Sequence, residues 1–148
     1  MANLKEFVKG QELFFITSDK TVREAVKIMT EADIGAVCVF EGDRLVGMFS
    51  ERDLMKRVVN RDLNPAEVKL SDVMTKQLIV AQADEEVRDA LEKMQQLHCR
   101  HMPVVENKKL IGVVSLRKLL LHDVSLKSEE LKLLDAYITY SPMRQEGV

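Results

Sequence analysis

The segment Gly47-Met-Phe-Ser50-Glu-Arg52-Asp53 carries the clearest chemical pattern in the sequence. A glycine allows a ligand to approach the backbone closely, and a serine at a helix N-terminus stands beside free N–H groups that favour an anion. An aspartate one turn later can accept hydrogen bonds from two neighbouring hydroxyls, such as those of a ribose. The spacing therefore fits one end of a nucleotide, with Ser50 on phosphate and Asp53 on the sugar.

The same residues also fit a purely structural role. Ser50 is a favourable N-cap residue, and Asp53 would be an acid of the first turn, where the helix dipole stabilises a negative charge. Caps of this kind are common, so these residues alone leave both interpretations open.

Other reactive side chains in the sequence point to no enzyme. Ser50 has no histidine at a recognisable partner spacing, and no Gly-rich phosphate loop of the Walker type occurs. The stretch His98-Cys99-Arg100-His101 offers metal-binding side chains but no evident fourth ligand. We therefore expect no catalytic residue and no metal site.

The composition fits one soluble domain. The chain has 148 residues, 46% of them hydrophobic, and a formal net charge of −2. Without a basic excess, nucleic-acid binding is disfavoured, and no apolar run is long enough to span a membrane. The two cysteines, Cys38 and Cys99, are too few for a disulfide framework. These properties predict a soluble, cytoplasmic protein that binds no membrane.

The sequence aligns with itself when it is shifted by 65 positions. The identical pairs include Asp19/Asp84, Val22/Val87, Arg23/Arg88, Gly47/Gly112 and Ser50/Ser115. A duplication of one unit of about 60 residues explains this match. Because a unit of that size is marginally stable alone, we expect the two copies to share one core about a pseudo-twofold axis.

Each copy repeats the same order of elements. Apolar residues at helical spacing predict a first helix, capped by Thr21 in one copy and by Asp84 in the other. Apolar runs joined by tight turns predict a hairpin, after which Ser50 and Ser115 begin second helices. The expected strands are 14–16, 36–40 and 45–49 in the first copy and 78–80, 102–105 and 110–114 in the second. The order strand–helix–strand–strand–helix, twice, predicts an α+β fold.

The predicted organisation is a single domain over residues 1–148. We place the first repeat at about 5–60, the second at about 69–124 and an amphipathic C-terminal helix at about 128–140. The connection between the repeats is short and contains Asn64-Pro65.

A tandem unit that ends in glycine-x-x-serine-x-x-aspartate resembles the CBS-domain family. From about Lys5 to Val124 the chain resembles one CBS pair, or Bateman module, of the stand-alone bacterial type. Two further motifs support the resemblance: Asp72-Val-Met74-Thr75 and Cys99-Arg100-His101-Met102-Pro103. It implies a regulatory module for adenosine compounds, with two clefts that each draw on both repeats.

The resemblance implies that one of the two clefts is complete. In it Asp53 would hold the ribose, while Ser50, Arg100 and His101 would face phosphates. The residues expected to enclose the adenine are Ile79, Val80, Met102 and Pro103. The full nucleotide-binding set carried over is Met48, Ser50, Arg52, Asp53, Thr75, Ile79, Val80, Arg100, His101, Met102 and Pro103.

The second cleft departs from the family pattern. It would use Phe15, Val37, Ser115 and Lys118. Lys118 stands where the first copy has Asp53, so a group that can only donate replaces the ribose acceptor. We expect this degenerate cleft not to bind an adenosine nucleotide in the same way.

Together these implications predict a sensor or regulatory module with AMP, ADP or ATP as its ligand and no prosthetic group. We expect a homodimer and allow for an unidentified target protein. Two alternatives stay open: a module for S-adenosylmethionine, and a ligand-free structural or oligomerisation module.

Overall fold

The computed structural model describes residues 3–124, which form two compact units. One unit comprises residues 11–80 and is called here the 11–80 unit. The other, called the 81–124 unit, comprises residues 81–124 together with the N-terminal residues 3–10. The C-terminal helix predicted over about 128–140 lies outside the described residues.

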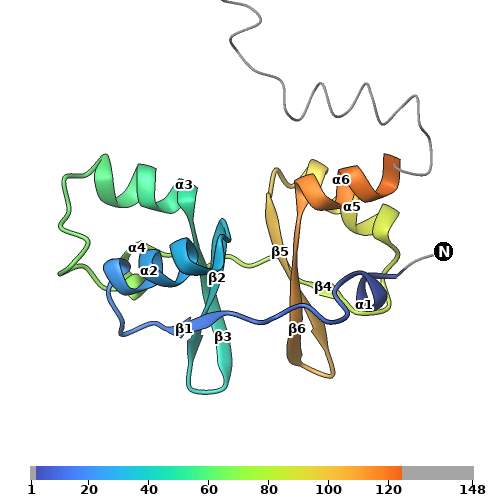
Figure 1. Cartoon of the computed structure of the whole chain (residues 1–148), viewed down its shortest axis with the longest axis horizontal. Helices are drawn as coiled ribbons and strands as arrows, with labels where there is room; N and C mark the ends of the chain where they lie inside the picture. Colours follow the sequence, from blue (N-terminus) through green and yellow to red (C-terminus); the bar gives the residue numbers. More distant parts are fainter. Residues whose placement is uncertain (1–2, 125–148) are drawn as a thin grey trace, which may run out of the picture. The chain divides into compact units, whose positions relative to one another are not determined.

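The 11–80 unit contains one three-stranded sheet with the order β1-β2-β3 (Figure 1). Strand β1 pairs parallel with β2, and β2 pairs antiparallel with β3. A buried apolar cluster, which includes Val22, Val39 and Phe49, joins the sheet to its helices. Its elements are β1 (Phe15–Thr17), α2 (Val22–Ala32), β2 (Ala36–Glu41), β3 (Arg44–Ser50), α3 (Glu51–Asp53), the π-helix η1 (Leu54–Val59) and α4 (Leu70–Val73).

The 81–124 unit repeats this topology, with the sheet order β4-β5-β6. Strand β4 pairs parallel with β5, and β5 pairs antiparallel with β6. Its elements are α1 (Leu4–Phe7), β4 (Ala81–Gln82), α5 (Val87–Gln96), β5 (His101–Glu106), β6 (Lys109–Ser115) and α6 (Leu116–Val124). The tandem α+β prediction and both predicted hairpins are therefore confirmed.

Each unit takes a short helix from the segment that leads into the other repeat. The amide of Leu4, in α1, donates to the carbonyl of Glu85 at 2.9 Å, so α1 belongs to the 81–124 unit. In the same way the amide of Leu70, in α4, donates to the carbonyl of Lys20 at 2.9 Å. The chain thus exchanges the two leading helices, and this places Thr75, just after α4, beside the first repeat.

The helix starts follow the sequence in three cases out of four. Thr21 forms the predicted capping box with Glu24, and Ser50 caps α3. Ser115 accepts a hydrogen bond from the amide of Lys118 at 3.1 Å at the start of α6. The prediction for Asp84 was wrong, because the N-cap of α5 is Glu86, which makes no side-chain capping bond.

Two further elements differ from the expectation. The lead strand of the second repeat is β4, at Ala81–Gln82, whereas we predicted residues 78–80. The helix after Ser50 becomes a π-helix over Leu54–Val59, whereas its counterpart α6 is a regular α-helix. Among the described residues, no helix is long and apolar enough to cross a membrane.

Candidate functional site

The carboxylate of Asp53 is the centre of the candidate site in the 11–80 unit. The Asp53 side chain is 8% exposed, and its Oδ2 accepts hydrogen bonds from the Ser50 amide at 3.0 Å and the Ser50 hydroxyl at 3.1 Å. The Thr75 hydroxyl donates to Oδ1 at 3.0 Å. These contacts include the capping box of α3, so the structural interpretation of the Ser50–Asp53 spacing is realised.

Backbone pairing holds Thr75 next to this carboxylate. The amide of Met48 donates to the carbonyl of Thr75 at 2.9 Å, and the amide of Thr75 donates back to the carbonyl of Met48 at 2.8 Å. The group formed by Met48, Ser50, Asp53 and Thr75 is called here the Asp53 cluster. It brings together four of the residues predicted for the nucleotide site.

Gly47 has a different role from the one we predicted. We expected Gly47 to give a ligand access to the backbone, but Met74 and Thr75 occupy the space beside it. A Cβ at Gly47 would lie 2.7 Å from the sulfur of Met74 and 2.8 Å from the carbonyl oxygen of Thr75. The glycine therefore lets the segment after α4 pack against β3, and so it positions Thr75.

Arg57 completes the surroundings of Asp53, although sequence reasoning missed it. The run of charged residues around Arg57 is typical of a solvated helix face, but this arginine has specific partners. Its Nη1 donates to the carbonyl of Met74 at 2.9 Å, and its Nε lies 3.6 Å from Oδ1 of Asp53. The i,i+4 spacing of an acid and a base was the available signal.

The other residues predicted for the nucleotide site in this unit are more exposed to solvent than Asp53. Arg52 is exposed, and Ile79 and Val80 are partly buried in the segment that precedes β4. Met48, in contrast, is buried, at 5% exposure.

The four remaining residues predicted for this site lie in the 81–124 unit. Met102 and Pro103 are buried in β5, Arg100 is exposed, and His101 is partly buried and pairs with Ser115 across the hairpin. Because these residues and the Asp53 cluster belong to different units, the complete nucleotide site stays a prediction.

The pKa of His101 lies below its ordinary value of 6.5. Burial is the main cause, because it disfavours the charged imidazolium. The positive charges of Arg100 and Lys118 lower the pKa further. We had predicted His101 and Lys118 for different clefts, but the field of Lys118 acts on His101 within this unit.

The residues predicted for the degenerate cleft are also divided between the units. Phe15 is 59% exposed and meets the ring of Phe40 edge-on at 5.5 Å, whereas Val37 is 1% exposed. In the other unit, Ser115 accepts from the backbone of Lys118, whose side chain is exposed. Lys118 thus takes part in a cap through its amide and offers no acceptor where Asp53 has a carboxylate.

The cysteines and the metal-ligating side chains are further reactive groups of the described residues. Burial raises the pKa of the Cys38 thiol to about 12, so this cysteine is an apolar core residue. Within residues 3–124, no group of three or more His, Cys, Asp or Glu side chains is placed to hold a metal ion.

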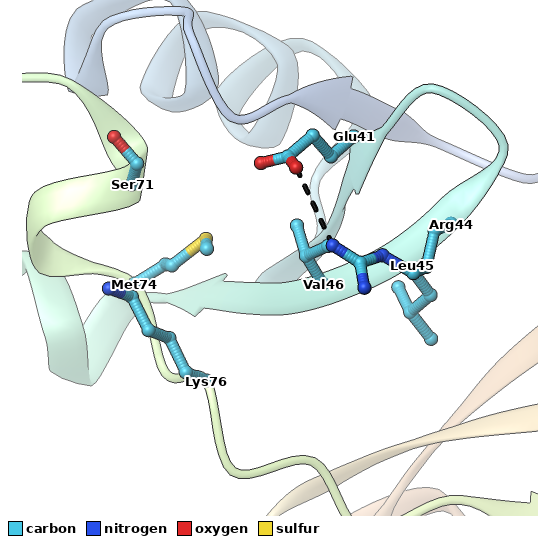
Figure 2. A pocket seen from close by; sticks show the side chains of 7 residues that line it. All are labelled: Glu41, Arg44, Leu45, Val46, Ser71, Met74 and Lys76. Carbon is cyan, nitrogen blue, oxygen red and sulfur yellow. Dashed lines mark ion pairs between the residues drawn. The ribbon is translucent and has the colours of Figure 1, made fainter.

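A surface hollow of about 400 Å³ lies beside the first residues of β3, Arg44 to Val46. Figure 2 shows the ion pair of Glu41 and Arg44 on one side of it and Met74 and Lys76 on the other. Met74 links this hollow to the segment that carries Thr75, but the carboxylate of Asp53 does not line it.

Comparison with known proteins agrees with the duplicated architecture. The sequence matches the CBS domain twice, over residues 6–60 and 70–125. It is 35% identical over 127 residues to the CBS domain-containing protein CBSX3, mitochondrial, of Arabidopsis thaliana. That alignment covers 82% of this chain and 62% of the relative, so the chain spans less than two thirds of that protein.

Two solved structures resemble the chain over nearly their whole length. The CBS-domain containing protein ATU1752 of Agrobacterium tumefaciens has 28% identity and a TM-score of 0.76, over 82% of this chain and 99% of that one. The CBS domain pair of protein MJ0100, in complex with 5′-methylthioadenosine and S-adenosylmethionine, has 22% identity and a TM-score of 0.75, over 86% and 99%. The two matched repeats and their shared topology lead to one conclusion: the chain belongs to the CBS-domain family, as a tandem CBS pair.

Proposed function

We propose that this CBS pair is a regulatory module that binds an adenosine nucleotide (AMP, ADP or ATP) through Asp53 and carries out no chemistry of its own. The supporting observation is the buried Asp53 carboxylate, to which Ser50 and Thr75 present hydroxyl donors. A ribose offers the same kind of donor from its two neighbouring hydroxyls. It can therefore replace one or both protein hydroxyls on the carboxylate without leaving the buried charge unsatisfied.

The remaining predicted residues have the chemistry for the other parts of the nucleotide. Arg100 and His101 would contact phosphate, for which a guanidinium is well suited because its fork of N–H donors matches the oxygens. The residues proposed to contact the adenine are Ile79, Val80, Met102 and Pro103.

The adenosine class also draws support from the CBS pair of MJ0100. That protein was solved with 5′-methylthioadenosine and S-adenosylmethionine, which share the adenosine moiety. Both have a ribose but no phosphate, so S-adenosylmethionine remains the second candidate for this chain.

Regulation would follow from linkage. A ligand shifts the equilibrium between two arrangements of the chain only to the extent that it binds them with different affinity. A target protein that recognises one arrangement would then respond to the concentration of the nucleotide.

A thermal-shift series tests this function. AMP, ADP, ATP, adenosine and S-adenosylmethionine are added to the purified chain, with GMP as a control for the base. A specific ligand at 100 times its Kd stabilises the folded state by about 2.7 kcal/mol, which is readily measured. We expect a rise in Tm with at least one adenosine nucleotide and none with GMP.

The other outcomes select among the alternatives. A response to S-adenosylmethionine alone would favour that ligand, since it lacks phosphate. If no adenosine compound changes the Tm, the ligand-free structural module is correct. Release of phosphate from ATP by the purified chain would contradict the absence of catalysis.

A further inference from the structure

Arg57 makes contacts that join Asp53 to the end of helix α4. Its Nη1 donates to the carbonyls of Met74 at 2.9 Å and of Val73 at 3.4 Å, while its Nε lies 3.6 Å from Oδ1 of Asp53. The Arg57 side chain is 41% exposed and the Asp53 side chain 8%, so this ion pair joins a partly exposed arginine to a buried carboxylate.

The two carbonyls that Arg57 binds are the ones that a short helix leaves without partners. Helix α4 ends at Val73, with Met74 as its C-cap residue. The last carbonyls of a helix have no intrahelical donor, and a cationic side chain there is favourable. Thr75 is the next residue after Met74. By binding these carbonyls, Arg57 therefore holds the chain at the point where it leaves α4 and approaches Asp53.

The second repeat supplies a comparison for this contact. His122 occupies the place of Arg57 in the repeat, and its ring meets that of Phe7, in α1, edge-on at 5.1 Å. The position therefore contacts the leading helix in both units. In the first repeat this contact is combined with the Asp53 carboxylate, whereas the equivalent position of the second repeat is Lys118. Because His122 contacts its leading helix without a guanidinium, that contact alone does not explain the arginine at position 57.

We propose that Arg57 is a positioning residue of the ribose site. It fixes the Asp53 carboxylate and the chain that carries the Thr75 hydroxyl in one arrangement. The π-helix Leu54–Val59 is the segment that presents Arg57, and irregular helices of this kind are frequent at functional sites. The inference rests on the proposed function for the identity of the ligand, but not for the contacts themselves.

The first test needs no ligand. The amides of Met48 and Thr75 bond to each other's carbonyls, so their hydrogen exchange reports whether Thr75 stays in place. In Arg57→Gln we expect both amides to exchange about tenfold faster, while the amides of β2 change less than about twofold, because the opening is local. Arg61→Gln, a change at an exposed arginine, is the matched control and should leave all of these rates unchanged.

The second test uses AMP and calorimetry. Arg57→Gln should raise the Kd about tenfold, and Arg57→Lys should give a smaller loss, because lysine keeps the charge but not the planar fork. If Arg57 acts through the carboxylate, its effect should shrink in an Asp53→Ala background, so that the two losses are not additive. A purely structural arginine would give additive losses and uniformly faster exchange.

The outcomes separate this inference from the proposed function. If the wild-type chain binds no adenosine compound, the proposed function fails, and the exchange rates alone decide whether Arg57 positions the Asp53 cluster. If wild type binds AMP but Arg57→Gln behaves like Arg61→Gln in either measurement, the role of Arg57 is overturned while the function stands.

Discussion

Thr75 donates its hydroxyl to the carboxylate of Asp53, at 3.0 Å from Oδ1 and 3.2 Å from Oδ2. The two residues are 22 positions apart, and Thr75 belongs to the segment that leads into the second repeat. The duplication and the exchange of leading helices therefore create this contact together, since neither repeat supplies both groups from its own hairpin and helix.

Replacing Thr75 by valine should destabilise the protein. The change removes a hydrogen bond to a buried charged group, which contributes about 1.5–3 kcal/mol, and we expect the lower end because Thr75 is only partly buried. Urea denaturation of wild type and Thr75→Val measures the difference, and Thr75→Ser, which keeps the hydroxyl, is the control. Equal stability of the valine variant would show that the contact is not formed in solution.

Gly47→Ala should disturb the same contact from the other side. The new methyl group would lie 2.8 Å from the backbone carbonyl of Thr75, which cannot move as a flexible side chain could. We expect a loss of about 1–3 kcal/mol, as for other overpacked positions. Gly42→Ala is a comparison for backbone strain alone, because a Cβ there meets nothing within 4 Å but the positive φ of 62° costs an alanine about 1–2 kcal/mol. A Gly47→Ala variant as stable as wild type would contradict this account of β3.

The lowered pKa of His101 should make the stability of the protein depend on pH. Because its pKa is lowered in the folded chain, the unfolded chain binds the proton first as the pH falls below 6.5. The free energy of unfolding should therefore fall from pH 6.5 down through the lowered pKa, and less so in His101→Gln. Denaturation of both proteins between pH 7.5 and 5 measures this, and parallel curves would refute it.

The same residue should also affect nucleotide binding. A phosphate beside His101 favours the imidazolium, so the affinity for AMP should increase as the pH falls below 6.5. The ratio of the wild-type and His101→Gln affinities removes the titration of the phosphate itself. A ratio that is the same at pH 7.5 and 5.5 would show that His101 does not contact phosphate.

The sequence predicted the hairpins and the helix faces because their periodicity is a local property. Periodicity does not reveal that the leading helices pack against opposite repeats, since this depends on tertiary contacts of Leu4 and Leu70. The family resemblance, in contrast, placed Thr75 with Ser50 and Asp53, and the structure brings these residues together. The roles of Gly47 and Arg57 were missed for the same reason. Gly47 packs against Met74 and Thr75, and Arg57 binds the carbonyls of Val73 and Met74, all far along the chain. The i,i+4 spacing signals the Arg57–Asp53 pair, but no local motif reveals these distant neighbours.

Asp84 shows the limit of reasoning by local motif. It is a good capping residue just before a predicted helix, but the register of the repeat places Glu86, not Asp84, opposite Thr21. Asp19, the counterpart of Asp84, likewise stands outside the cap and accepts a hydrogen bond from the Thr17 hydroxyl at 2.6 Å. Comparison of the two copies would have given the correct cap.

The predicted homodimer has a candidate surface on the segment that follows Asp53. Met55 and Val59 are 58% and 61% exposed, and Leu63 is 38% exposed. Exposed apolar side chains at this spacing favour association with a second copy about a twofold axis. Sedimentation at micromolar concentration should show a dimer, and Met55→Lys with Val59→Lys should shift it to a monomer. A wild-type chain that sediments only as a monomer would refute the prediction.

The two copies should differ sharply in ribose binding. Asp53 has a buried carboxylate within reach of two hydroxyls, whereas Lys118 has an exposed ammonium that cannot accept a hydrogen bond. Calorimetry on wild type should therefore give one strong adenosine site per chain. Asp53→Ala removes hydrogen bonds to a charged group, about 1.5–3 kcal/mol, which corresponds to a ten- to hundredfold loss of affinity.

Lys118→Ala is the matched variant, and adenosine is the decisive ligand for it. Adenosine has the ribose but no phosphate, so its affinity should stay within the ~0.5 kcal/mol typical of surface substitutions. A loss confined to AMP would place Lys118 near the phosphate, in line with its effect on His101. Asp53→Asn keeps the size of the side chain and is measured beside Asp53→Ala. Circular dichroism shows whether each variant is folded. Two equal sites in wild type, or Asp53→Ala binding as well as wild type, would overturn the asymmetry, because only the carboxylate can accept from the ribose.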